Sequence, residues 1–261
     1  MTESILSGEK RMSSSILITG SNRGIGLALT QQLLLRGHRV IAGCRQVETA
    51  TELRESVLPA GAELDVQPLE ITSESSVAAL ARHVALKYSS LDVLINNAAI
   101  LIDQDNHSVL DWDLQQLVFT LETNLVGTVR VTQAFWPLLV KGKNPRVINI
   151  SSGAGLISGK NNSRHYAYSI SKAALNMFTR LLEIEGRQVS VGVVAVIPGR
   201  VRTRMTGNAA PQSALETAQC LAEMIENVRM EDAGRILDRH GKPCFDGSFR
   251  DAEGRVCHVG W

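Results

Sequence analysis

Thr19-Gly20-Ser21-Asn22-Arg23-Gly24-Ile25-Gly26 is the stretch that decides the fold. It joins a short apolar run, Ile16–Thr19, to a segment in which Ile25, Leu29 and Leu33 recur every four residues. The run predicts a buried strand, and the recurrence predicts a helix with one apolar face. Glycines at such a junction leave backbone N–H groups bare beside the helix N-terminus, where a dinucleotide pyrophosphate can bind. Taken alone, they also fit a tight packing turn, but their place in the first strand–helix unit favours the pyrophosphate site.

The rest of the chain repeats this alternation of apolar runs and helical segments. The expected strands are Ile16–Thr19, Arg39–Gly43, Leu64–Leu69, Leu91–Asn96, Arg146–Ser151, Val189–Ile197 and a short one at Arg235–Leu237. The expected helices are Ile25–Arg36, Val47–Ser56, Ser73–Tyr88, Asp111–Val140, Tyr166–Arg187 and, approximately, Gln212–Val228. This order predicts an α/β fold with a doubly wound parallel sheet of the Rossmann type. One domain, residues 15–261, would follow a flexible tail, residues 1–14.

Composition and charge limit the partners and the cysteine chemistry that we expect. The chain has 261 residues, 44% of them hydrophobic, and its 27 basic and 26 acidic residues leave a net charge of +1. Neither nucleic acid nor an anionic membrane is therefore expected as a partner. Cys44, Cys220, Cys244 and Cys257 are scattered and include no Cys-x-x-Cys pair. They predict free thiols in a reducing cytoplasm, with no disulfide framework and no metal site.

The end of the second strand indicates which dinucleotide would bind. Enzymes that use NAD usually carry an Asp or Glu there for the ribose 2′-hydroxyl. Here the run Val40-Ile41-Ala42-Gly43-Cys44-Arg45 contains no acid, and the next one is Glu48. Arg45, with Arg23 from the glycine turn, can bind a 2′-phosphate, although either arginine alone also fits a solvated surface charge. The pattern predicts NADPH.

Tyr168 and Lys172 are four residues apart and so share one helix face. Reduction of a carbonyl needs a proton donor as well as a hydride. A tyrosine, whose ordinary pKa is about 10, becomes responsive when a neighbouring cation stabilises its anion. Such a pair alone is usually a surface contact. Here Asn149-Ile150-Ser151-Ser152 ends an expected strand, where open α/β sheets bind their ligands, so the pair becomes a candidate active site.

The ordered set of motifs resembles the short-chain dehydrogenase/reductase family over about residues 15–237. The set comprises the glycine turn, Asn96-Asn97-Ala98-Ala99, Asn124-Leu125-Val126-Gly127, Ser152, Tyr168 with Lys172, and Ile197-Pro198-Gly199-Arg200-Val201-Arg202-Thr203. In finer detail, Gly43-Cys44-Arg45 and Val201-Arg202-Thr203-Arg204-Met205 are similar to the sniffer and C-factor type of carbonyl reductase.

The resemblance implies a role for each matching residue. Tyr168 would be the general acid, Lys172 would lower its pKa and bind the nicotinamide ribose, Ser152 would polarise the carbonyl, and Asn124 would hold a relay water. The implied cofactor contacts are Gly20, Ser21, Asn22, Arg23, Gly24, Ile25, Gly26, Arg45, Glu70, Ile71, Asn97, Ala98, Ala99, Tyr168, Lys172, Pro198, Gly199, Val201 and Thr203. The expected activity is NADPH-dependent reduction of a ketone or aldehyde, by hydride transfer from the family-typical nicotinamide face. The expected assembly is a homodimer or homotetramer.

The sequence departs from the family pattern in three places, and these departures leave some residue roles open. Ala99 stands where the family has glycine, and we expect it to be tolerated. Sixteen residues separate Ser152 from Tyr168, about three more than usual, so Ser151 remains an alternative to Ser152. Arg200, where the subgroup often carries an aromatic residue, either binds an acidic substrate or points into solvent, and solvent is slightly favoured. His165 is an alternative acid–base group, less favoured than the tyrosine.

Two other functions remain as alternatives. A nucleotide-sugar epimerase or dehydratase uses the same scaffold, but such enzymes usually have a larger C-terminal substrate domain. A regulatory protein that only binds nucleotide would not need the tyrosine–lysine pair. Substrate recognition is expected in a loop and lid at about residues 200–228.

Overall fold

The computed structural model describes residues 13–56, 58–103, 108–158, 160–244, 247–250 and 256–259. A parallel sheet in the order β3-β2-β1-β4-β5-β6-β7 forms the centre of this part of the chain. Its strands are β1 (Ser15–Thr19), β2 (Arg39–Cys44), β3 (Glu63–Pro68), β4 (Val93–Asn96), β5 (Arg146–Ile150), β6 (Gly192–Ile197) and β7 (Ile236–Asp238). The order runs outward from β1 in both directions, so the predicted doubly wound parallel sheet is confirmed.

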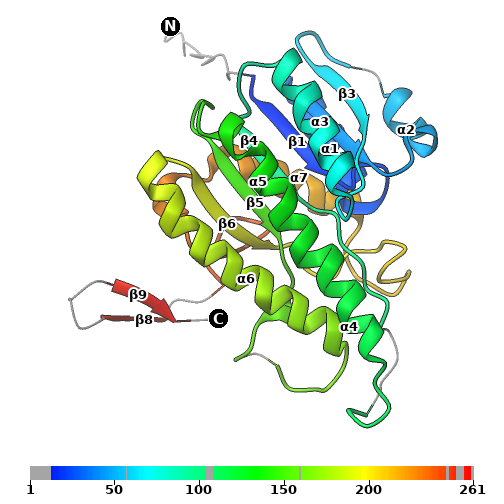
Figure 1. Ribbon diagram of the computed structural model, residues 1–261, viewed down its shortest axis with the longest axis vertical. Coiled ribbons are helices and arrows are strands. Elements are labelled where there is room, and N and C mark those ends of the chain that lie inside the picture. The colour runs from blue at the N-terminus through cyan, green and yellow to red at the C-terminus, as the bar shows by residue number, and fades with distance from the viewer. Residues whose placement is uncertain are drawn as a thin grey trace, which may run out of the picture.

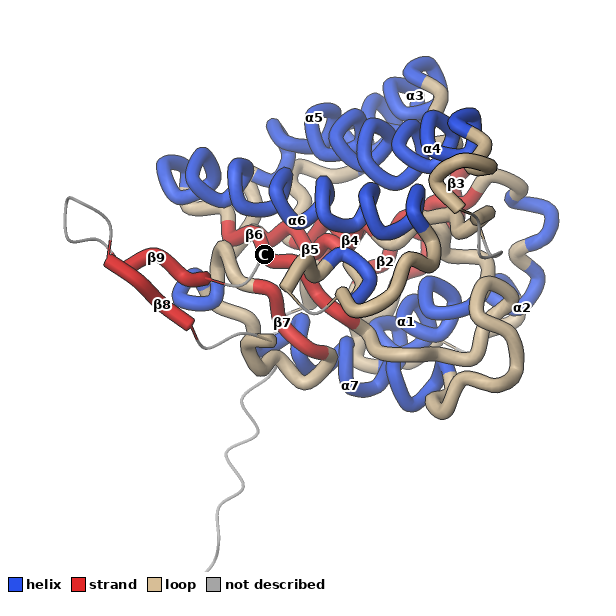
Figure 2. The backbone as a smooth tube through the Cα atoms, turned by 90° about the horizontal axis from the view of Figure 1, so that it is seen from below, coloured by secondary structure: helices blue, strands red, loops and turns tan. Residues whose placement is uncertain are grey.

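Helices cover both faces of the sheet (Figures 1 and 2). One layer contains α1 (Gly24–Leu35) and α7 (Ala214–Asn227), and the other contains α3 (Glu74–Lys87), α4 (Leu114–Leu121), α5 (Thr128–Leu139) and α6 (Tyr166–Gly186). A short α2 (Thr51–Arg54) follows β2. None of the described helices is both long and apolar enough to cross a membrane.

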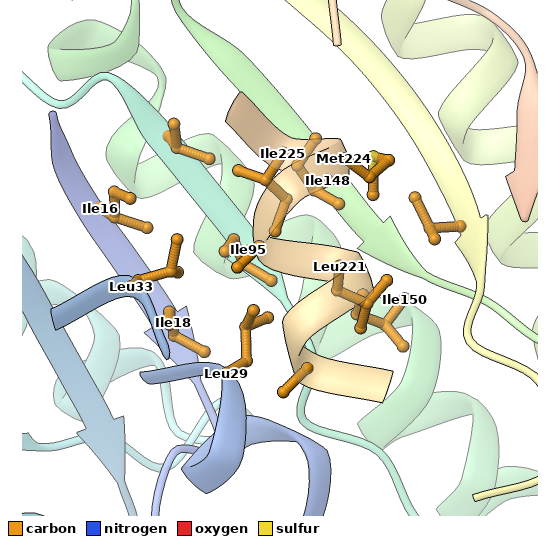
Figure 3. Close-up of a cluster of buried hydrophobic side chains, with 14 of the residues drawn as sticks. Ile16, Ile18, Leu29, Leu33, Ile95, Ile148, Ile150, Leu221, Met224 and Ile225 are labelled. Atoms are coloured by element: carbon orange, nitrogen blue, oxygen red, sulfur yellow. The ribbon is translucent and has the colours of Figure 1, made fainter. Parts of the chain in front are cut away.

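Each layer encloses its own hydrophobic core. Beneath α1 and α7, Ile18 and Ile95 of the sheet pack with Leu29, Leu221 and others, all fully buried (Figure 3). On the opposite face, Leu94 and Val193 pack against Phe135 of α5 and neighbouring apolar side chains. Because successive strand residues point to opposite faces, a sheet buried on both sides needs uninterrupted apolar runs, which the sequence has.

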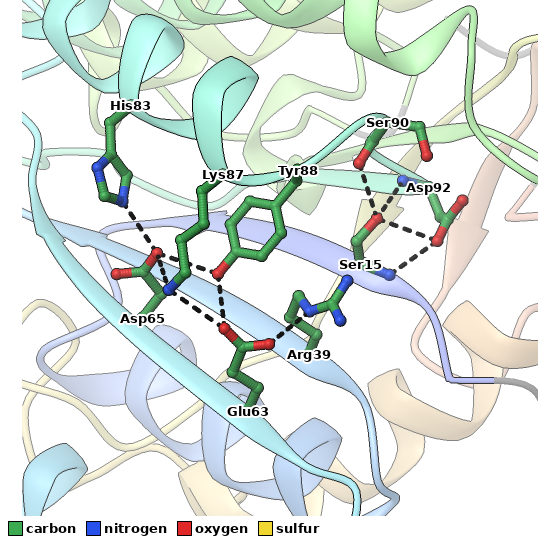
Figure 4. Close-up of polar contacts among 9 residues, drawn as sticks. All are labelled: Ser15, Arg39, Glu63, Asp65, His83, Lys87, Tyr88, Ser90 and Asp92. Atoms are coloured by element: carbon green, nitrogen blue, oxygen red, sulfur yellow. Dashed lines mark hydrogen bonds and ion pairs between the residues drawn. The ribbon is translucent and has the colours of Figure 1, made fainter.

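A polar network fixes the edge strand β3 to α3 (Figure 4). Asp65 accepts hydrogen bonds from His83, Lys87 and Tyr88, at 3.0, 3.0 and 3.1 Å. Burial alone would raise the pKa of Asp65, but the hydrogen bonds donated to its carboxylate outweigh burial and lower that pKa to about 2. The network therefore stabilises the fold above about pH 4 and is lost as the pH falls toward 2.

The structure differs from the sequence predictions at several boundaries. The helix expected over residues 111–140 begins at Leu114 and contains a π-helical segment, η2 (Glu122–Gly127). The helix expected at Val47–Ser56 is a 3₁₀ turn, η1 (Val47–Thr49), followed by one turn of α2. The strand expected from Val189 begins only at Gly192, because Arg187–Val189 forms the 3₁₀ turn η4.

The described segments at the two ends of the chain lie outside the main sheet. A hairpin of β8 (Gly247–Arg250) and β9 (Val256–Val259) follows the main sheet and had no counterpart in the prediction. The predicted flexible tail lies outside the described residues, except for Ser13 and Ser14. Ser14 donates its backbone N–H to Nδ1 of His38 over 3.2 Å.

Candidate active site

The glycine turn lies between β1 and α1, against the loop that follows β4. Gly20 has a φ of +70°, which glycine adopts without strain. A Cβ atom added to Gly26 would lie 2.2 Å from the Gly20 carbonyl oxygen and 2.5 Å from Nδ2 of Asn97. Asn97 Nδ2 in turn donates to the carbonyl oxygens of Thr19 and Gly20, over 2.9 and 3.2 Å. The turn is thus packed so closely that only glycine fits at position 26.

The N-terminus of α1 could hold the pyrophosphate of a dinucleotide. Arg23 at its N-cap makes no side-chain capping bond, and the first turn contains no acidic residue. By contrast, Ser73, Asp113 and Ser213 cap α3, α4 and α7 with their side chains. The backbone donors that begin α1 therefore suit an external anion, and the glycines leave its approach clear of side chains. No group of His, Cys, Asp or Glu in the described chain is arranged to hold a metal ion.

Arg45 follows β2 at the same edge of the sheet. Its side chain is 62% exposed, and its Nε lies 3.8 Å from Oε2 of Glu70, which follows β3. Glu70 is oriented by Thr72, whose hydroxyl donates to Oε1 over 2.9 Å. Ile71 is buried and lies beneath Gly127, where an added Cβ would come within 2.9 Å of the isoleucine side chain. Among the residues that the structure describes, Glu70 is the only ion-pair partner of this exposed guanidinium, so a phosphate could replace the carboxylate.

Tyr168 and Lys172 lie on the first turns of α6. The Lys172 Nζ is 5.7 Å from the centre of the Tyr168 ring, and it donates to the Ile150 carbonyl oxygen over 2.7 Å. Burial raises the pKa of Tyr168, and a hydrogen bond with the Ser152 side chain acts in the opposite direction. Burial also lowers the pKa of Lys172, to about 8. Three groups that can exchange or stabilise protons therefore meet at the carboxyl end of β5.

Ser151 and Ser152 occupy different environments. Ser151 is buried, and its hydroxyl donates to Oδ1 of Asn176 over 2.6 Å, within the packing of α6. Ser152 is half-buried and stands beside the Tyr168 phenol. Its Oγ accepts the backbone N–H of Ala154, which fixes the side chain at the start of the 3₁₀ turn η3 (Gly153–Gly155). Of the two serines, only Ser152 is next to the tyrosine.

Asn124 lies in the π-helical segment and is almost fully buried. Its side chain exchanges two hydrogen bonds with the backbone of Ile100, of 2.8 and 2.9 Å, and donates to Oγ of Ser171 over 3.0 Å. Ser171 directly precedes Lys172, so Asn124 connects the loop after β4 to the lysine helix. π-Helical turns of this kind are frequent at functional sites.

Asp103 holds the beginning of α6 and was not predicted. It is buried, and its Oδ2 accepts the backbone N–H groups of Ala167 and Tyr168, over 2.7 and 3.4 Å. Its carbonyl oxygen accepts a 2.7 Å bond from Nδ1 of His165, which must therefore carry the proton. An Asp after the apolar run 98–102 is the only sequence signal, since its partners are more than sixty residues away.

The loop after β6 completes the site. Gly199 has a φ of +89°, Val201 is buried, and a Cβ on Gly24 would lie 3.3 Å from the Thr203 side chain. Of the predicted stretch Pro198 to Thr203, Thr203 therefore reaches the glycine turn. Arg200 is exposed, as favoured from the sequence. Ala98 and Ala99 are half-buried, and the backbone N–H of Ala98 is fixed by the Thr19 hydroxyl over 3.0 Å.

Comparison with known proteins places this site in a family. Residues 14–214 match the family model described as short chain dehydrogenase. The chain belongs to the short-chain dehydrogenase family. Carbonyl reductase Sniffer of D. melanogaster is similar in structure, with a TM-score of 0.82 and 28% identity, covering 89% of this chain and 99% of its own.

Two further family relatives cover most of their own lengths. An NADPH-bound carbonyl reductase from chicken fatty liver has a TM-score of 0.79 and 32% identity, covering 88% of this chain and 98% of its own. An uncharacterized oxidoreductase of Schizosaccharomyces pombe is 31% identical over 245 residues, which are 92% of this chain and 95% of the relative. The chain is therefore an oxidoreductase of this family, with carbonyl reductases among its structural neighbours.

Burial of the Lys172 ammonium should lower the stability of the folded protein. Its folded-state pKa of about 8 lies below the ordinary lysine pKa of 10.5, because burial disfavours the ammonium. Below about pH 8 this ammonium destabilises the fold, and the effect fades as the pH rises toward about 10. Lys172→Met should therefore raise the free energy of unfolding near pH 7 by about 1–2 kcal/mol, after the lost bond to Ile150 is deducted.

Denaturant unfolding at about pH 7 and about pH 9.5 tests this effect. The gain over the wild type should shrink at the higher pH. A variant less stable than the wild type at both pH values would show that the buried ammonium is not a source of instability.

Proposed function

We propose that the protein reduces a ketone or aldehyde to an alcohol with NADPH. The observation that carries this proposal is the meeting of Ser152, Tyr168 and Lys172 at the carboxyl end of β5, at the same sheet edge where the glycine turn follows β1. A protein that only bound nucleotide would have no use for a buried ammonium beside a buried phenol, because burying both groups is costly.

The three side chains divide the proton chemistry between them. Bound NADPH would supply the hydride. Tyr168 would donate its phenolic proton to the carbonyl oxygen as negative charge develops there, and Ser152 would hold that oxygen by a second hydrogen bond. The Lys172 ammonium would stabilise the resulting tyrosinate, which burial alone disfavours.

Asn124 would complete the proton path. Its side chain is fully engaged with Ile100 and Ser171, so it fixes the geometry around Lys172 and does not itself titrate. We propose that this arrangement holds a water between the Asn124 region and the Lys172 ammonium, through which Tyr168 regains its proton from solvent.

The preference for NADPH is supported by Arg45 and by the lack of an acid at the end of β2. A 2′-phosphate near the exposed guanidinium would gain a charge-assisted hydrogen bond that a 2′-hydroxyl cannot offer. The chicken carbonyl reductase was solved with NADPH bound, which agrees with this assignment. A cofactor kept reduced in cells also favours reduction over oxidation.

Arg45→Asp should reverse the cofactor preference. The wild type should bind NADPH at least about tenfold more tightly than NADH, and the variant should bind NADPH about 100-fold more weakly than the wild type. Titration of each cofactor by protein fluorescence measures both affinities, with the exposed Arg82→Gln as a control for net charge. Equal or tighter binding of NADH by the wild type would exclude the phosphate site at Arg45.

The activity is tested by adding NADPH to the wild type with a panel of ketones, aldehydes and quinones. Consumption of NADPH with formation of the matching alcohol supports the proposal. Epimerised or dehydrated sugar nucleotides without net NADPH consumption would point to the other chemistry possible on this scaffold.

We further propose a homodimer or homotetramer in the cytoplasm. On α6, Met177, Leu181 and Ile184 are 52%, 60% and 51% exposed and share one helix face, which suits a subunit contact. The described cysteines Cys44, Cys220 and Cys244 are free thiols, as is usual in a reducing compartment. Light scattering of the wild type should give the mass of two or four chains, and Leu181→Lys should reduce that mass. A monomeric wild type would overturn the proposed assembly.

A further inference from the structure

Two loops leave the carboxyl ends of the neighbouring strands β5 and β6 (Figure 1). One follows β5 and spans residues 151–165, and the other follows β6 and spans residues 198–213. β5 and β6 pair in parallel, and the backbone N–H of Ser151 continues the pairing to the Val196 carbonyl oxygen over 2.8 Å. The first loop contains Ser152 and leads into α6, which carries Tyr168.

The two loops carry charge of one sign. They contain Lys160, Arg164, Arg200, Arg202 and Arg204, and neither contains an Asp or a Glu, although the whole chain has a net charge of only +1. Some cations elsewhere do form ion pairs, as Arg39 does with Glu63 and Arg130 with Glu122. Within the part of the chain that the structure describes, none of the five loop cations forms an ion pair.

Lys160 is held close to the candidate site. Its Nζ donates to the Arg164 carbonyl oxygen and to the Ser169 hydroxyl, both over 2.9 Å. Ser169 directly follows Tyr168, so the ammonium is fixed over the first turn of the helix that carries the tyrosine. These contacts use two of its three N–H donors, which leaves one for a ligand.

Arg200 belongs to the other loop. It directly follows Gly199, is exposed, and has no hydrogen bond with the described residues. Arg202 is different, because its Nη1 donates to the carbonyl oxygens of Ala210 and Pro211, over 3.3 and 3.1 Å, and so fixes the lid loop. Lys160 and Arg200 are therefore cations, one in each loop, that keep donors for a ligand.

Two exposed apolar side chains lie in the loops that follow β4 and β5. Ile157, in the loop after β5, is 69% exposed, and Ile102, in the loop after β4, is 45% exposed. Each is a large aliphatic side chain left in water beside the candidate site, which suits contact with the body of an apolar substrate.

We propose that the substrate is an aldehyde or ketone that carries an anionic group, a carboxylate or a phosphate, at the end away from the carbonyl. Lys160 and Arg200 bind that group, while Tyr168 and Ser152 engage the carbonyl oxygen. This inference rests on the proposed reductase function. The two cationic loops also concentrate anions before they bind, an effect that added salt weakens, although Asp103 in the loop after β4 acts electrostatically on Lys160.

The test compares two aldehydes of nearly equal shape, para-formylbenzoate and para-formylbenzamide, at saturating NADPH. The carboxamide withdraws electrons more strongly than the carboxylate, so intrinsic reactivity favours the neutral aldehyde. The wild type should nevertheless show a kcat/KM for the benzoate about fivefold higher at low salt, as expected for two partly exposed charge pairs. This ratio should fall toward one as salt is added.

The double variant Lys160→Gln/Arg200→Gln should bring the ratio of the two kcat/KM values to one or below at low salt. The control Arg82→Gln, which removes a distant charge on α3, should keep the wild-type ratio. A wild type that prefers the benzamide, or a double variant that keeps the wild-type ratio, overturns the inference. A double variant in which only the KM for NADPH changes also overturns it, because the cations then serve the cofactor. Failure to reduce either aldehyde, or any member of the wider carbonyl panel, counts instead against the reductase function.

Discussion

Tyr168→Phe is expected to lower kcat for carbonyl reduction by about 10²–10⁴-fold, the usual contribution of a positioned general acid. The change removes one oxygen atom and with it the donor beside Ser152. The Lys172 ammonium keeps its bond to the Ile150 carbonyl oxygen, so the cleft should stay folded. NADPH should still bind, because the glycine turn and Arg45 are untouched. Steady-state kinetics and a fluorescence titration of NADPH measure the two effects separately.

Tyr166→Phe is the matched control for this variant. Tyr166 lies two residues earlier on α6 and stacks on Trp112, with ring centres 5.0 Å apart. It undergoes the same chemical change without a place beside Ser152, so its kcat should stay close to that of the wild type. A Tyr168→Phe protein as active as the Tyr166→Phe protein would contradict the role of general acid.

Gly26→Ala should abolish useful cofactor binding. The new methyl group would lie 2.2 Å from the Gly20 carbonyl oxygen and 2.5 Å from Asn97 Nδ2, so the turn must open. Overpacking of this kind costs about 1–3 kcal/mol of stability. Displacement of the backbone donors at the start of α1 should weaken NADPH binding by at least about 100-fold, or roughly 2.7 kcal/mol.

Gly153→Ala serves as the control, because an added Cβ there would meet no atom within 4 Å. Calorimetric titration of NADPH and thermal unfolding should separate the two variants, with Gly153→Ala close to the wild type in both. Wild-type affinity for NADPH in Gly26→Ala would mean that the cofactor does not bind at this turn.

The sequence predicted those parts of the fold and site that depend on local pattern. Apolar runs located the strands, and the four-residue spacing put Tyr168 and Lys172 on one face of α6, as the structure has them. The glycine turn was recognisable because three glycines follow a strand and begin a helix, a local requirement of backbone geometry. The order of the family motifs along the chain then indicated that these segments belong to one site.

What the sequence did not reveal depends on contacts between distant segments. Asp103 caps α6 from more than sixty residues away, and no local rule connects it to Ala167. The choice between Ser151 and Ser152 required knowing that Asn176 accepts a hydrogen bond from the first of them. Likewise, η2 interrupts the long helix where Asn124 binds the loop after β4, a tertiary contact that periodicity does not record.

The central claim is that a hydride passes from NADPH to a carbonyl carbon in this site, with the proton supplied by Tyr168. The most direct measurement uses NADPH carrying deuterium at the transferable nicotinamide position, with a reducible aldehyde and mass spectrometry of the alcohol. The wild type should form alcohol with one deuterium bound to carbon, and Tyr168→Phe should form almost none under the same conditions. Alcohol without carbon-bound deuterium, or equal labelling by the variant, would contradict the account.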